Sequence, residues 1–139
     1  MEGLRGANDL IVMAGSAPLQ MQKNYPTRAA AEAYVDKTIE TLNARTDAND
    51  FLYYMNASRN YNSEPKLETI TAPVLWINSA DDFINPPELG IAQKLVSRIP
   101  HAKFVLIPIS DSTRGHGTHT NAAVWKSELV EFLRETEKK

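Results

Sequence analysis

Cysteine is absent from this chain of 139 residues, which also has no excess of basic residues and no long apolar run. Without cysteine there is no disulfide framework, thiol nucleophile or thiolate metal site. The formal net charge of −2 gives no field that attracts nucleic acid or an anionic membrane. No apolar run approaches the roughly 18–20 residues of a transmembrane helix, and the first ten residues lack the layout of a signal peptide. We therefore expect a cytoplasmic protein with no nucleic-acid or membrane partner.

The residues that are present indicate an ordered globular protein. A hydrophobic content of 42% with 23% charged residues is typical of a folded domain, and 139 residues fit one compact domain. Residues 1–62 have helix and loop patterns, whereas residues 63–139 alternate strand and helix patterns. The chain is thus predicted to combine a helical segment with an α/β segment.

The first segment contains helix formers behind recognisable capping residues. Thr27 and Asp47 each precede such a run, and both residue types favour the N-cap position. We expect a helix over 7–15, a connecting loop up to position 27, a helix over 28–45 and a helix over 48–58. Tyr53, Tyr54 and Tyr61 are expected to pack against the sheet, with the lining of an acyl pocket as the alternative.

The second segment has the pattern of a β-α-β-α unit. The run "APVLWINSA" (72–80) and the run "KFVLIPI" (103–109) suit strands buried on both faces. Pro86 and Pro87 open a helix that reaches Ile99, because proline is tolerated in a first turn. A final amphipathic helix covers 121–135. The two strands of such a unit are expected to be parallel.

Acidic residues and histidines follow these two strands. Asp81 and Asp82 leave the first strand, and His116 and His119 lie in the loop after the second. The carboxyl ends of parallel strands share one edge of the sheet, where ligands and catalytic groups collect. Neighbouring strands are about 4.8 Å apart, so a carboxylate and an imidazole come within reach. Such a pair favours general base catalysis.

The segments "VLWINSADDFINPPE" and "KFVLIPISDSTRGHGTHT", with the closing helix, resemble the C-terminal half of an α/β-hydrolase of the homoserine O-acetyltransferase-like branch. The resemblance implies a partial α/β-hydrolase fold: a short parallel sheet of two main strands packed by helices, with residues 1–62 as a helical cap-like segment. It implies Asp82, four positions before Pro86, as the catalytic acid, and His116, after Gly115, as the catalytic histidine. The implied activity is that of an ester hydrolase (esterase) or acyltransferase on a small-molecule ester or acyl substrate, without cofactor or metal.

The chain departs from that family, since the nucleophile motif Gly-x-Ser-x-Gly does not occur in it, and the oxyanion-hole loop and the early strands are missing too. Ser16 follows Gly15 but lacks the second glycine, and Ser79, Ser110 and Ser112 have no comparable context. Three interpretations stay open. The serine comes from an unrecognised position or from another chain; or His116 activates water directly; or the chain is a truncated, non-catalytic half-domain that acts as a dimerising or interaction module.

The same residues also suit roles other than catalysis. His116 and His119 with Asp81 and Asp82 offer enough ligands for zinc, but histidine pairs of that kind lie at i, i+4 on a helix, and these are three apart between glycines. Asp81 is expected to be solvated or to cap a helix. His119 is expected to help cap the last helix or to face solvent, and His101 is expected in a surface turn.

A sheet of two strands leaves one strand with an uncovered edge. Exposed edges pair with other chains, and large apolar patches mark interfaces. We therefore expect a homodimer, formed either by joining two small sheets or by exchanging helices that cover the open edge.

Overall fold

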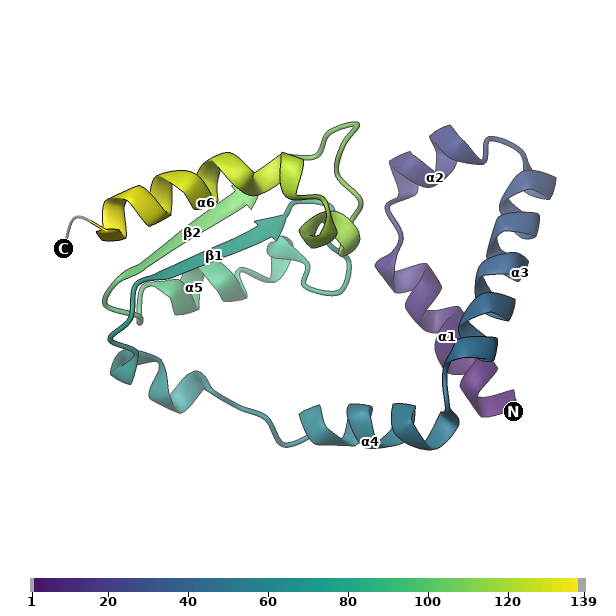
Figure 1. Cartoon of the computed structure of the whole chain (residues 1–139), viewed down its shortest axis with the longest axis horizontal. Helices are drawn as coiled ribbons and strands as arrows, with labels where there is room; N and C mark the ends of the chain where they lie inside the picture. Colours follow the sequence, from purple (N-terminus) through teal and green to yellow (C-terminus); the bar gives the residue numbers. More distant parts are fainter. Residues whose placement is uncertain (1, 138–139) are drawn as a thin grey trace.

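The computed structural model describes residues 2–137, which form six α-helices, three short 3-10 helices and two strands (Figure 1). The α-helices are α1 (Glu2–Gly15), α2 (Pro18–Asn24), α3 (Arg28–Arg45), α4 (Ala48–Ser58), α5 (Ile91–Val96) and α6 (Ala122–Glu137). The strands are β1 (Val74–Ser79) and β2 (Ala102–Ile107), and the 3-10 helices are η1 (Glu64–Thr69), η2 (Pro87–Leu89) and η3 (Gly117–Thr120). Residue 1 of the predicted first segment and residues 138 and 139 of the second lie outside the described part.

The two strands are parallel neighbours, as predicted. They pair in register from Val74 with Ala102 to Ser79 with Ile107. The chain crosses from β1 to β2 through α5, and Figure 1 shows α5 on one face of the sheet and α6 on the other. The mixed α/β class with a short two-stranded parallel sheet is therefore confirmed, while the assignment of this unit to part of an α/β-hydrolase fold stays a prediction.

Both strands are less buried than their apolar sequences predict. Five of the six residues of β1 are only half-buried, and Ser79 alone is buried. The expectation of strands buried on both faces is wrong because, within residues 2–137, β1 has no neighbouring strand on the side away from β2. Tyr53, Tyr54 and Tyr61 do not cover the sheet either, since their exposed fractions are 75%, 75% and 79%.

The N-terminal helices begin where the capping residues place them. The Thr27 hydroxyl accepts a hydrogen bond from the Ala30 amide at 3.2 Å, and Asp47 accepts bonds from Asn49 and Asp50 at 2.8 and 3.1 Å. The loop expected before Thr27 is wrong, because α2 occupies most of it. Pro18 starts this helix, where its missing N–H costs no hydrogen bond.

The helix expected from Pro86 to Ile99 is interrupted. Gly90 has a φ of +66°, a left-handed conformation that ends η2 before α5 begins. The apolar periodicity of the sequence continues across Gly90, so the pattern does not predict this break. As a result α5 is short, and the turn that holds Asp82 is followed by a 3-10 helix rather than by regular helix.

The N-terminal helices reach the histidine-bearing loop after β2. The Gln20 side chain of α2 donates a hydrogen bond to the Asp111 carbonyl at 2.8 Å, and Lys23 pairs with the Asp111 carboxylate at 3.1 Å. The predicted boundary between residues 62 and 63 falls in the connection from α4 to η1 and stays a prediction. No helix of the described residues is long and apolar enough to cross a membrane.

Candidate active site

A tight turn after β1 fixes the carboxylate of Asp82. Its Oδ1 accepts hydrogen bonds from the backbone amides of Ile84 at 2.8 Å and Asn85 at 3.0 Å, the pattern of an Asx-type turn. The Asn78 side chain donates to the Asn85 carbonyl at 2.8 Å and ties this turn to the end of β1. Asp82 is only 5% exposed, so its carboxylate is held in one orientation.

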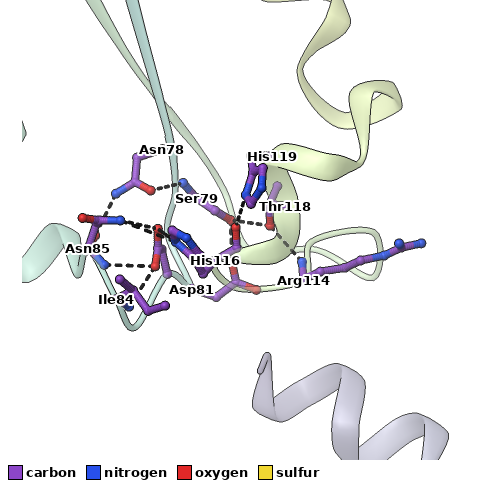
Figure 2. A network of polar contacts seen from close by, with 10 residues as sticks. Asn78, Ser79, Asp81, Ile84, Asn85, Arg114, His116, Thr118 and His119 are labelled. Carbon is purple, nitrogen blue, oxygen red and sulfur yellow. Dashed lines mark hydrogen bonds and ion pairs between the residues drawn. The ribbon is translucent and has the colours of Figure 1, made fainter. Parts of the chain in front are cut away.

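The second carboxylate oxygen faces His116. Asp82 Oδ2 lies 3.1 Å from His116 Nδ1, although 34 positions separate the two residues, and Figure 2 shows the contact network. A carboxylate can only accept, so Nδ1 carries the proton and donates it to Asp82. The Asn85 amide nitrogen is 3.4 Å from both Nδ1 and Oδ2. Because Nδ1 is a donor, that amide donates to Asp82.

This tautomer leaves His116 Nε2 with a free lone pair while the imidazole is neutral. The His116 side chain is 38% exposed, so water reaches it. A buried carboxylate on Nδ1 stabilises the imidazolium that forms when Nε2 takes a proton. The arrangement is that of a general base.

Two opposing effects set the pKa of Asp82. Burial raises it, whereas hydrogen bonds from Asn85, His116 and Ile84 lower it, and the net result is a pKa below the ordinary aspartate value. The carboxylate therefore stays ionised at neutral pH.

Gly115 allows the loop to place His116 at the sheet edge. It is buried and has a φ of +57°, and a Cβ built on it would lie 2.8 Å from the backbone oxygen of Ser16. The connection between α1 and α2 thus packs against the residue that precedes His116. Thr113, fully buried, closes the start of the same loop by donating to the Ser110 carbonyl at 2.9 Å.

A chain of hydroxyl groups joins the end of β1 to the histidine-bearing loop, and sequence reasoning missed it. The Ser79 hydroxyl donates to the Asp81 carboxylate and accepts from Thr118 at 3.1 Å, and Thr118 in turn accepts from the Arg114 amide at 2.8 Å. Asp81 is therefore half-buried and engaged with Ser79, rather than solvated or capping a helix. The Ser-x-Asp spacing directly after a strand is the sequence feature from which the bond between Ser79 and Asp81 could have been predicted.

The other two histidines do not touch Asp82. His119 lies in η3, where its Nδ1 donates to the His116 carbonyl at 2.6 Å, and the two rings are 5.3 Å apart. It is exposed but caps no helix with its side chain. His101 lies in a surface turn, as expected, where its carbonyl accepts from the Val74 amide. No three metal-ligating side chains gather in the part of the chain that the structure describes.

A pocket of about 570 Å³ opens beside the pair. Asp82, His116 and His119 lie at one end of it, and its walls are largely apolar. The lining residues include Leu75, Trp76, Ile77, Ile84, Pro86, Leu89, Ile91 and Trp125. An apolar pocket with a few convergent polar groups is typical of a small-molecule site.

No serine of the described residues is exposed in this pocket. Ser79 lines it but is 4% exposed, and its hydroxyl is engaged with Asp81 and Thr118. Ser16 and Ser112 line a separate hollow between the N-terminal helices and the histidine-bearing loop. The Ser16 hydroxyl donates to the Met13 carbonyl. The structure therefore brings the predicted acid and histidine together, and of the four candidate serines only Ser79 lines their pocket.

Comparisons with known protein families, curated proteins and solved structures found no match. The contacts around Asp82 and His116 are thus the basis for any functional assignment.

Substitution of Gly115 tests how the loop is built. In Gly115→Ala the new Cβ clashes with backbone and sits on a residue with left-handed backbone. In Gly90→Ala the backbone is left-handed but the Cβ meets no other atom, and in Gly117→Ala neither problem arises. We expect a loss of about 1–2 kcal/mol in unfolding free energy for Gly90→Ala, a larger loss for Gly115→Ala, and a change within about 0.5 kcal/mol for Gly117→Ala. Denaturant titration measures all three. Equal losses at Gly90 and Gly115 would contradict the contact with Ser16.

The lowered pKa of Asp82 predicts a pH-dependent contribution to stability. Because the pKa is lower in the folded chain than the value of about 3.9 in the unfolded chain, this contribution is complete above the unfolded value and is lost as pH falls through the folded one. The gap in unfolding free energy between wild type and Asp82→Asn should therefore shrink as the pH falls below about 4.

Chemical denaturation across this pH range measures the gap. Asp36→Asn, which removes a carboxylate from the exposed surface of α3, is the matched control. A gap for Asp82→Asn that does not change with pH would show that the carboxylate is not held in its ionised form.

Proposed function

We propose that this chain carries the acid–histidine pair of an ester hydrolase or acyltransferase of the α/β-hydrolase type. The observation that carries the proposal is the contact of 3.1 Å between Asp82 and His116 at the carboxyl edge of two parallel strands. Both residues also border the apolar pocket, whose lining includes Ile84, Pro86 and Leu89. An ester with a small apolar acyl group suits this site.

In the proposed reaction His116 Nε2 takes the proton of a hydroxyl group as its oxygen bonds to the carbonyl carbon of the ester. The carbonyl π electrons move to the oxygen and return when the bond to the leaving alkoxide breaks, and the alkoxide takes the proton from Nε2. Asp82 holds the ring and stabilises its charged form throughout. The hydroxyl group belongs to water or to a serine presented by another chain, since no exposed serine of residues 2–137 lines the pocket.

A non-catalytic role is the second candidate, and the position of the serines favours it. A chain that keeps the acid and the histidine but presents no nucleophile can act as a dimerising or interaction module. The two candidates differ in a simple observable, which is turnover.

Hydrolysis of a small aryl acetate by the purified chain tests the proposal. General base catalysis contributes about 10²–10⁴-fold in rate, so His116→Ala should lose about 100-fold or more, and Asp82→Asn should also be slowed. His101→Ala, in the surface turn, is the matched control and should keep the wild-type rate. Equal rates for wild type and His116→Ala, in chains shown to be folded, would favour the non-catalytic role.

Labelling with a fluorophosphonate probe then identifies the nucleophile. Intact mass and peptide mapping should show an adduct on one serine, lost in His116→Ala, if a serine of this chain reacts. Turnover without an adduct would assign the attacking oxygen to water.

A further inference from the structure

The edge of β1 that faces away from β2 has free backbone donors. The amides of Val74 and Ala80 donate to carbonyls at the two ends of β2, each at 2.9 Å. Because backbone groups alternate between the two sides of a strand, the amides of Leu75, Ile77 and Ser79 point to the open side. The Ser79 amide is already bonded to the Asn78 side chain at 2.8 Å. Leu75 and Ile77 are left as the donors of this edge.

The apolar pocket follows the same edge. Its lining contains the consecutive residues 75–79, together with Ile91 and Ala92 of α5 and Trp125 of α6. Since α5 and α6 cover opposite faces of the sheet (Figure 1), this part of the pocket is a groove between two helices with a strand edge as its floor. The Trp125 indole nitrogen is buried without a hydrogen-bond partner in the described chain. A polypeptide strand has the shape that such a groove accepts.

Nothing in β1 protects the edge from pairing. Exposed edges usually carry lysine, proline or a bulge, yet residues 74–79 are uncharged and contain no proline, and their pairing with β2 runs without a break. The strand β2 by contrast carries Lys103, and Pro108 follows it directly. Two copies of β1 can therefore meet with no like charges opposed, and each copy is itself an uncharged, extended segment with a free edge.

We propose that the groove receives β1 of a second copy of this chain, antiparallel and related by a two-fold axis at Trp76. Leu75 then forms a hydrogen-bonded pair with Ile77 of the second copy, and Ile77 with Leu75, which uses both free donors of each edge. Trp76 faces Trp76 of the second copy at a non-hydrogen-bonded position, where Cα atoms are about 4.5 Å apart and aromatic pairs stabilise the sheet. Pro73 ends the pairing.

The resulting dimer has a four-stranded sheet in the order β2, β1, β1, β2. It covers the strand side of the pocket and leaves the end with Asp82 and His116 open, because the paired region stops before Ser79. The dimer depends on the free edge and not on the chemistry of the pair. It is therefore tested separately from the proposed function.

Sedimentation velocity of the full chain tests the dimer. Wild type should have twice the mass of the chain, and Leu75→Lys should have the monomer mass, because a charge enters the paired edge. Leu106→Lys is the matched control: it places the same charge at the outer edge of β2, where the side chain is 38% exposed, and it should stay dimeric. Far-UV circular dichroism confirms that each variant is folded.

A spectroscopic readout locates the axis. Two tryptophans in close contact across strands give an exciton couplet in circular dichroism, which should be present in wild type, should disappear in Trp76→Phe and should leave the dimer mass of that variant unchanged. A monomeric wild type, a dimer that withstands Leu75→Lys, or a dimer without the couplet would each overturn the proposal.

Discussion

The bond between Asp82 and His116 is the interaction on which the site depends. It joins two loops that leave neighbouring parallel strands, and it fixes the imidazole with one nitrogen bonded and the other free. Each partner has its own support, since two backbone amides hold Asp82, while Gly115 and the loop around it place His116. Without the parallel register of β1 and β2, neither support would bring the two side chains together.

Much of this site could be predicted from the sequence because it follows from topology. Two apolar strands joined by a helix are expected to be parallel neighbours, so residues just after them share an edge, and Asp82 and His116 are such residues. The hydroxyl chain through Ser79 and Thr118 could not be predicted, because periodicity does not tell which side chains bond across loops. Gly90 was missed for a related reason: its left-handed backbone lies inside an apolar pattern that continues across it.

The positions of the serines decide whether the described chain itself offers a nucleophile to His116. Sequence alone left Ser16 as a candidate nucleophile, but its hydroxyl is bonded within its own turn and lies on a different hollow from His116. The edge of β1 away from β2 is also unpaired in the described chain, which explains why most of this largely apolar strand is only half-buried. The chain thus holds a well-supported acid–histidine pair, and no exposed serine of the described residues lines the pocket beside it.

The most direct measurement of the central claim is the tautomer of His116, read by long-range nitrogen–proton correlation NMR on the ¹⁵N-labelled chain at neutral pH. The account predicts a proton on Nδ1 and a free Nε2, and a loss of this preference in Asp82→Asn. The three histidines can be assigned by single substitution of His101 and His119. A proton found on Nε2 of His116 in the wild-type chain, with Nδ1 free, would contradict the bond to Asp82 and with it the general-base assignment.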